Sequence, residues 1–176
     1  MIEFVLKNRR LRLHPDGVMY VRDHWGGKET KNEKWKEIKF WKCNGYDVCR
    51  IRVDGKERYL SKHRLLTLAH DPTWDIFDVS PSNCIDHENH IRDDNSNDNL
   101  RVVTKQQNNF NRSGVKGYYW NKRNNKWEAK IMLDGKSKYL GLFEKEEDAH
   151  NAYMEAKPKY HVIAAPPAPG PVSPTD

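Results

Sequence analysis

The sequence predicts an α+β protein made of small modules. Its 176 residues are only 36% hydrophobic, a content that favours small cores over one large core. Short alternating segments bounded by Gly, Asn and Asp predict strands, and a few segments with apolar residues at helical spacing predict helices. Two compact modules fit these observations best.

The first seventy residues predict mainly short strands. They are expected at VMYVR (18–22), KEIKFW (36–41), CRIRV (49–53) and KERYL (56–60). Asp54-Gly55 joins the last two and suits a type I′ hairpin turn. A helix is expected next, because Ser61 can cap its N-terminus and Leu65, Leu68 and Ala69 share one face. Asp71-Pro72 is expected to end it.

The centre of the chain predicts two strands, a polar loop and a helix. IDH (85–87) and LRVV (100–103) are the expected strands, and the Asn- and Asp-rich segment 88–99 between them is expected to be a loop. Thr104 and Gln107 have the spacing of a capping box, so the helix is predicted to begin at Lys105.

From Gly114 the pattern changes to three strands and a helix. The strands are expected at KGYYWNK (116–122), KWEAKIML (126–133) and SKYLGLF (137–143), joined by turns at Asn124-Asn125 and Asp134-Gly135. The helix is expected from Glu144, with an apolar stripe that must pack on the sheet: Ala149, Ala152, Tyr153 and Ala156. After His161, five prolines predict a disordered or polyproline-like tail.

Charge is unevenly distributed along the chain. Residues 1–70 carry 17 basic and 9 acidic side chains, 71–113 carry 4 and 8, and 114–161 carry 10 and 7. Two basic segments on either side of an acidic one suit a protein that binds a polyanion through both basic segments, with a cation-binding site in the acidic segment between them. An uneven solvated surface is the alternative.

Cysteine spacing and hydropathy narrow the classes of protein. Cys43, Cys49 and Cys84 form no C-x-x-C pair, so they are expected to be reduced thiols, although a structural zinc held by these three and a nearby His is an alternative. The five-residue apolar start is too short for a signal peptide, and no later run is long enough to span a bilayer. We therefore expect a soluble cytoplasmic protein that does not interact with a membrane.

The stretch CIDHENHIRDDNSNDNLRVVTKQQNNFNR (84–112) carries the chemistry. His87 is followed twelve residues later by Asn99 and twenty-one residues later by Asn108. This pattern resembles the HNH nuclease family, in whose ββα-metal fold a hairpin and a helix hold one divalent cation. Asn108 stands where the family name has its final His, as in the phage homing endonuclease branch.

The resemblance implies a role for each of these residues. Asp86 and Asn108 would be the metal ligands, His87 the general base, and Asn99 the side chain that braces the loop beside His87. A His titrates near neutrality, as a base for phosphodiester hydrolysis must, and oxygen ligands favour Mg²⁺ or Mn²⁺ over zinc. Taken singly, each of these residues is typical of a loop, a cap or a surface. The joint pattern is what is specific.

Other residues around this motif have structural interpretations. His90, Asp93, Asp94 and Asn95 are interpreted as loop formers. Segment 47–70 is similar to the lead-in of phage HNH proteins, and its His63 is interpreted as structural.

A second resemblance covers Lys116 to about Tyr160. KGYYW, KWEAKI, YLGLF and EEDAHNAY are similar to an AP2-type DNA-binding domain, in which the open face of a three-stranded antiparallel sheet lies in the major groove. The resemblance and nearby charge imply these DNA contacts: Lys116, Tyr119, Asn121, Lys122, Arg123, Lys130 and Tyr139. Trp127 alternates with Glu128 and Lys130 and is expected in the core.

Four segments are therefore expected: a β-rich region (1–46), an HNH ββα-metal domain (47–113), an AP2-like domain (114–161) and the Pro-rich tail (162–176). Together they imply a metal-dependent, site-directed homing-type endonuclease, phage-encoded and acting in a bacterial host. We expect it to bind double-stranded DNA and no small-molecule substrate, to leave 5′-phosphate and 3′-hydroxyl ends, and to nick as a monomer. A catalytically inactive DNA-binding regulator and a restriction or non-specific nuclease are the alternatives.

Overall fold

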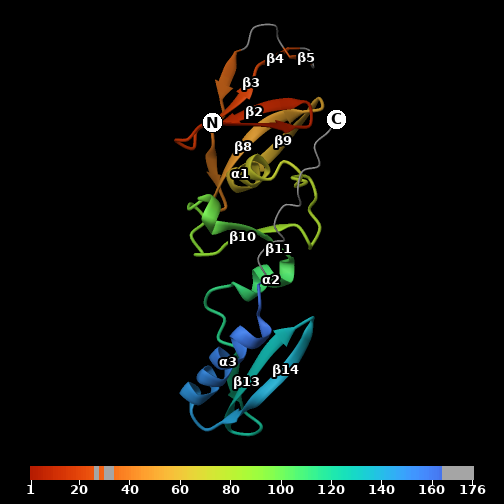
Figure 1. Cartoon of the computed structure of the whole chain (residues 1–176). Coiled ribbons are helices and arrows are strands. Elements are labelled where there is room, and N and C mark those ends of the chain that lie inside the picture. The colour runs from red at the N-terminus through yellow and green to blue at the C-terminus, as the bar shows by residue number, and fades with distance from the viewer. Residues whose placement is uncertain (26–27, 30–33, 164–176) are drawn as a thin grey trace, which may run out of the picture. The chain divides into compact units, whose positions relative to one another are not determined.

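The computed structural model describes residues 1–25, 28–29 and 34–163, and it has several small antiparallel sheets and few helices (Figure 1). The chain divides into two compact units. Of the described residues, unit 1 comprises Met1–Val79 and His87–Arg101, and unit 2 comprises Ser80–Asp86 and 102–163. The expected α+β class is thus confirmed. None of the described helices is long and apolar enough to cross a bilayer.

Unit 1 contains two larger antiparallel sheets and a short hairpin. The four-stranded sheet has the order β1 (Ile2–Leu6), β2 (Arg9–Leu13), β3 (Met19–Arg22), β6 (Trp35–Glu37). The three-stranded sheet has the order β7 (Trp41–Cys43), β8 (Tyr46–Val53), β9 (Lys56–Ser61). The hairpin pairs β4 (His24–Trp25) with β5 (Lys28–Glu29). Helix α1 (Lys62–His70) follows β9 directly.

Alternating apolar residues of both sheets form the core of unit 1 with α1. The inward positions on the first two strands are Phe4, Leu6, Leu11 and Leu13, and those on β8 are Cys49, Ile51 and Val53. Helix α1 adds Leu65, Leu66, Leu68 and Ala69. Because burial disfavours the thiolate, it raises the pKa of Cys49 to about 12, and Cys49 acts here as a small apolar residue.

Two local predictions for this unit are corrected. Segment 36–41 was expected to be one strand, but β6 ends at Glu37 and β7 begins at Trp41. Between them the buried Ile38 donates its N–H to the Met19 carbonyl, and the chain passes from one sheet to the other. Ser61 stands at the N-cap of α1, but its hydroxyl contacts His63 Nε2 at 3.1 Å instead of capping a backbone N–H.

The expected strand, loop, strand and helix order of the centre is confirmed. Strands β10 (Cys84–His87) and β11 (Leu100–Val103) form a two-stranded sheet, and a 3-10 turn, η1 (Asn97–Asn99), precedes β11. Helix α2 (Lys105–Phe110) begins where predicted, with both bonds of the Thr104 and Gln107 capping box present. The boundary between the units runs through this hairpin.

The rest of unit 2 is a three-stranded antiparallel sheet with α3 (Glu146–Tyr160) across one face (Figure 1). Its strands are β12 (Tyr118–Asn121), β13 (Lys126–Leu133) and β14 (Lys136–Phe143), in sequence order. The residues buried between sheet and helix are Ala129, Ile131, Ala149, Tyr153 and Ala156. Both expected hairpins form, whereas α3 begins two residues later than expected. The predicted Pro-rich tail lies outside the described residues from Ala164 onward.

Gly117 shows how closely the chain before β12 approaches the helix. Its φ is +71°, and a Cβ at this position would lie 2.0 Å from the ring of Tyr153. Only glycine combines this left-handed conformation with so short a distance to an aromatic ring.

Candidate active site

His87 is a buried imidazole at the last position of β10, only 7% exposed. Its Nε2 lies 3.1 Å from the side-chain oxygen of Asn95, across the loop. With an amide oxygen as acceptor, Nε2 carries the proton and the basic lone pair belongs to Nδ1. The contact therefore orients the ring and selects one tautomer.

The buried Asn99 joins the two sides of the loop that follows His87. Its side-chain amide nitrogen donates to the Asp94 carbonyl at 2.6 Å, and its side-chain oxygen accepts from the Asn89 N–H at 2.9 Å. Its backbone carbonyl accepts from the Glu88 N–H at 3.0 Å. One side chain thus fixes the loop that carries Asn95, the partner of His87.

Asp94 organises the same loop as an anion. Ser96 donates to its carboxylate from its hydroxyl at 2.7 Å and from its backbone N–H at 3.2 Å, and Asn89 donates from its amide at 2.6 Å. These bonds, those of Ser96 above all, lower the pKa of Asp94. The Asp-Asn pair at 94–95 therefore has two tasks, one in the turn and one at His87.

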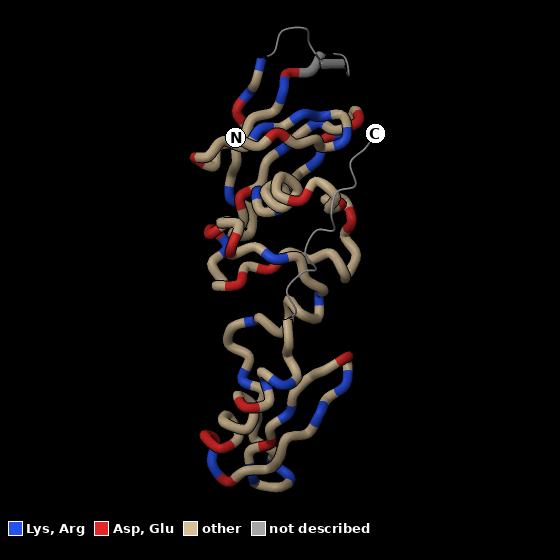
Figure 2. Tube along the Cα trace, in the orientation of Figure 1, with Lys and Arg blue, Asp and Glu red and all other residues tan. Residues whose placement is uncertain are grey.

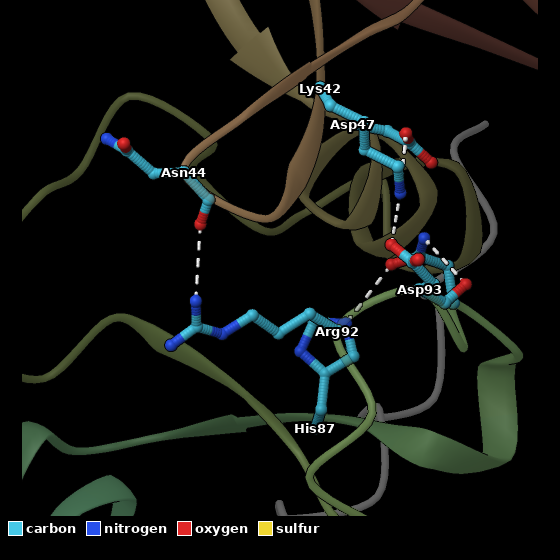
Figure 3. Close-up of polar contacts among 7 residues, drawn as sticks. Lys42, Asn44, Asp47, His87, Arg92 and Asp93 are labelled. Carbon is cyan, nitrogen blue, oxygen red and sulfur yellow. Dashed lines mark hydrogen bonds and ion pairs between the residues drawn. The ribbon is translucent and has the colours of Figure 1, made fainter.

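The β7–β8 hairpin of unit 1 is tied to this loop by two basic side chains. The Lys42 ammonium pairs with Asp93, and with Asp47 at 3.1 Å, and Arg92 donates to the Asn44 carbonyl at 3.2 Å (Figure 3). The two carboxylates, Asp93 first, raise the pKa of Lys42. No sequence pattern marks the contacts of Lys42 with Asp93 and of Arg92 with Asn44, which join positions about fifty residues apart.

His63 and Tyr46 pack around His87 within unit 1. The ring of His63 lies 5.3 Å from that of His87 in an edge-to-face arrangement, and the ring of Tyr46 lies 5.1 Å from His63 and 6.2 Å from His87. Arg92 lies 5.0 Å from the centre of the Tyr46 ring. Desolvation, and then the charges of His87 and Arg64, lower the pKa of His63 to about 4. His63 is thus a neutral ring beside His87.

Asp86 is a buried carboxylate in unit 2, 5% exposed. Its Oδ1 accepts a hydrogen bond of 3.0 Å from the side chain of Asn111, the C-cap residue of α2. The half-buried Asn108 lies one turn earlier on the same helix. The direct bond from α2 to Asp86 thus comes from Asn111 and not from Asn108.

The oxygen atoms of this group fit a hard divalent cation better than zinc. Asp86 offers a buried carboxylate, and Asn108 and Asn111 offer amide oxygens, the ligand type that Mg²⁺ accepts alongside water. Among the described residues no three His, Cys, Asp or Glu side chains gather as a metal site. The alternative of zinc on the three cysteines therefore has no cluster to support it: Cys49 is a core residue, whereas Cys43 is exposed.

The face of the unit 2 sheet opposite α3 presents aromatic and polar side chains. Tyr119 and Tyr139 are 46% and 56% exposed, and Lys130 lies 5.2 Å from the Tyr119 ring. Glu128 is buried among its neighbours, where it pairs with Lys130 at 2.7 Å and accepts from Asn121. These bonds, Lys130 first, lower the pKa of Glu128, and the Glu128 carboxylate raises that of Lys130. We call these five residues the open face of unit 2.

The remaining predicted contact residues lie outside the open face. Lys122 and Arg123 are exposed in the β12–β13 turn, and Lys116 precedes β12, 3.7 Å from Glu146. Trp127 is half-buried against Tyr118 and Trp120, whose ring centres lie 5.9 and 5.3 Å away. Trp127 was expected in the core, but it is half-buried and lies outside the buried cluster of Ile131, Tyr153 and Ala156.

The sequence pattern missed Asn95, Asn111, Tyr46 and Glu128 as members of these sites. Asn95 was interpreted only as a loop former, and Asn111 stands outside the His87, Asn99 and Asn108 spacing. Neither hydrophobic periodicity nor motif spacing in the sequence can identify these residues, because each contributes through a contact that forms only in the folded chain.

Comparison with known proteins agrees with the geometry around His87. No curated protein and no solved structure matches the chain. Residues 79–110 match the family described as HNH endonuclease, and this segment spans β10, the loop braced by Asn99, β11 and α2. This segment of the chain is thus similar to HNH endonucleases, and the similarity indicates a nuclease acting on nucleic acid.

Proposed function

We propose that this protein is a metal-dependent, site-directed endonuclease of the homing type that cuts double-stranded DNA. It leaves 5′-phosphate and 3′-hydroxyl ends, and one chain cuts one strand. The observation that carries the proposal is the HNH endonuclease match over 79–110, which contains a buried, oriented His87.

His87 has the properties of a general base in this proposal. The Asn95 contact holds the proton on Nε2, so that Nδ1 takes a proton from the attacking water. The phosphorus–oxygen bond to the 3′ carbon's oxygen then breaks, and the 3′ oxygen leaves with a proton supplied by solvent. Asn99 acts through the loop, because it holds the segment on which Asn95 sits.

Asp86, Asn108 and Asn111 are the residues that would hold Mg²⁺ or Mn²⁺. Such a cation neutralises charge on the phosphate when bound. Asp86 follows directly before His87 in the chain, so a ligand residue and the base are consecutive. Both residues lie within β10, where regular alternation turns neighbouring side chains to opposite faces, so a shared role for the pair requires a twist at the end of the strand.

The open face of unit 2 supports recognition of a duplex. Tyr119, Lys130 and Tyr139 combine exposed aromatic surface with a cation, as contacts to bases and phosphates require. Asn121 lies on the same face, where its amide is bonded to Glu128 and to the turn after β12. Lys122 and Arg123 add exposed positive charge in the β12–β13 turn, and Lys116 adds a further charge before β12, as phosphate contacts require. A module of this kind favours a site-directed enzyme over a non-specific one.

The test compares His87→Ala with wild type on duplex DNA in Mg²⁺. We expect cleavage to fall by at least about 100-fold, the usual contribution of a general base, while DNA affinity changes less than about twofold. The matched control is His90→Asn, an exposed loop histidine with a φ of +65°, a conformation that Asn tolerates. His90→Asn should cut like wild type.

Two results would contradict the proposal. Cleavage by His87→Ala at the wild-type rate would show that His87 is not the general base. Full activity in EDTA would show that cleavage does not require a metal ion. Stable DNA binding by wild type without any cleavage in Mg²⁺ or Mn²⁺ would favour the inactive regulator instead.

A further inference from the structure

The outer face of the β7–β8–β9 sheet in unit 1 is not used by the proposed function. Directly paired residues of antiparallel strands share a face, and the pairs here are Trp41 with Val48, Arg50 with Tyr59, and Arg52 with Glu57. The opposite face supplies Cys49, Ile51 and Val53 to the core. We call the six paired residues the Trp41–Tyr59 face.

Two aromatic rings stand on this face in water. Trp41 is 44% exposed and Tyr59 is 66% exposed, and their ring centres lie 6.2 Å apart at 85°. A strand pair that needed only stability would bury such rings, because each covers a large apolar area. Their exposure on the outer side of an antiparallel sheet leaves aromatic surface available to a planar partner.

The charges on the Trp41–Tyr59 face favour an anion. Arg50 stands opposite Tyr59 and has a weak contact of 3.6 Å with Glu57, the one acidic residue of the six. Arg52 is exposed and has no acidic partner among the side chains that the structure describes. Unit 1 also holds the basic first seventy residues, and Figure 2 marks their lysines and arginines in blue.

The same two strands lead to His87. Tyr46 begins β8 and its ring lies 6.2 Å from that of His87, and Ser61 ends β9 and contacts His63. A nucleic acid bound along these strands therefore runs towards the candidate base within a single unit.

We propose that the Trp41–Tyr59 face binds single-stranded nucleic acid by stacking unpaired bases on Trp41 and Tyr59, with Arg50 and Arg52 at the phosphates. In a duplex the faces of the bases are stacked on one another, so Trp41 and Tyr59 have few free base faces on which to stack. A single strand offers both the bases and the phosphates. Such a strand is exposed wherever a duplex opens, for example at a frayed end or a gap. The inference adds to the proposed function and does not depend on cleavage.

The test measures binding by the full chain in EDTA, where cleavage does not interfere. The probes are a fluorescein-labelled oligothymidylate of about 12 nucleotides, within the length range of single-strand sites, and a labelled duplex of the same length. Trp41→Leu and Tyr59→Leu keep an apolar side chain but remove the ring, whereas Trp41→Phe and Tyr59→Phe keep a stacking surface. Met154→Ala, an exposed residue of α3, is the control.

Each Leu variant should bind the single strand about tenfold or more weakly, the effect of losing one base–aromatic stack. The Phe variants and Met154→Ala should stay within about threefold of wild type, and duplex affinity should change less than about twofold in all. Equal thermal melting of the Leu and Phe variants shows that the fold is intact.

The proposal is overturned by unchanged single-strand binding of both Leu variants, by equal losses for duplex and single strand, or by no single-strand binding of wild type. None of these results depends on nuclease activity.

Discussion

At the scale of single residues, the buried His63 beside His87 predicts how the free energy of unfolding depends on pH. Burial, the main cause, lowers the pKa of His63 to about 4 in the folded chain, whereas an unfolded histidine titrates near 6.5. Between these values the unfolded chain binds more protons, so the free energy of unfolding falls as the pH drops from about 6.5 to about 4. Above pH 6.5 this contribution is fully present.

The measurement is urea unfolding of wild type and His63→Asn from pH 4 to 8. Other groups titrate in both proteins, so the difference in unfolding free energy isolates His63. We expect wild type to lose stability relative to the variant by an amount on the order of 3 kcal/mol between pH 7 and 4. A difference that is independent of pH would show that His63 is not desolvated.

Residues of the site divide into those that spacing predicts and those that only folding brings in. The positions of His87, Asn99 and Asn108 follow from a local pattern, and their intervals are visible in the chain. Asn95 and Asn111 act through side-chain bonds to His87 and Asp86, and Asn111 is 25 residues from its partner. No periodicity encodes such a bond. His63 was interpreted as structural, and its ring contact with His87 adds a link to the candidate base.

At the scale of elements, α2 depends on its cap. It has only six residues, and so short a helix gains little from its own backbone hydrogen bonds. The Thr104 hydroxyl accepts from the Gln107 N–H at 3.1 Å, and the Gln107 side chain accepts from the Thr104 N–H at 2.9 Å. Thr104→Ala should lower the free energy of unfolding by about 1 kcal/mol.

Urea unfolding checks this prediction, with Thr104→Ser as the matched control. Serine keeps the accepting hydroxyl, so Thr104→Ser should differ from wild type by less than about 0.5 kcal/mol. Equal losses in the two variants would assign the effect to the threonine methyl group and not to the cap. Because Asn108 and Asn111 both follow this cap, nuclease activity should fall with Thr104→Ala more than with Thr104→Ser.

Elements were predictable where a turn or cap residue marks their ends. Asp54-Gly55 and Asp134-Gly135 adopt positive φ values at both positions, as their hairpins require, and α2 starts at its capping box. Segment 36–41 was not predictable, because its strand pattern continues across Ile38 while the chain changes sheets there. That break is a property of the core, in which Ile38 is buried.

At the scale of the whole molecule, the charge pattern of the sequence agrees with the distribution of surfaces over the two units. The basic first seventy residues belong to unit 1 and include the Trp41–Tyr59 face, and the basic segment 114–161 belongs to unit 2 with its open face. The loop after His87 carries the acidic residues Asp93, Asp94 and Asp98. The sequence indicated a polyanion partner, but the exposed sheet faces could be recognised only from strand register.

The last prediction concerns how many strands one chain cuts. The HNH-like segment 79–110 contains one consecutive Asp-His pair, Asp86–His87, and it is followed in that segment by one Asn-bearing helix. One such site hydrolyses one phosphodiester, so a monomer should nick, and a double-strand break would need two sites. Two unlike units suit an extended asymmetric target better than a palindrome bound by a symmetric dimer.

The assay follows supercoiled plasmid carrying the target site at limiting protein, with His87→Ala as the inactive control. We expect open circles to accumulate first, at a rate proportional to protein concentration, and linear DNA to appear only later. Linear product without an open-circle intermediate, formed at a rate that rises with the square of protein concentration, would show a concerted dimer. That result would change the assembly but not the roles of Asp86 and His87, because each chain of the dimer would still cut one strand with its own pair.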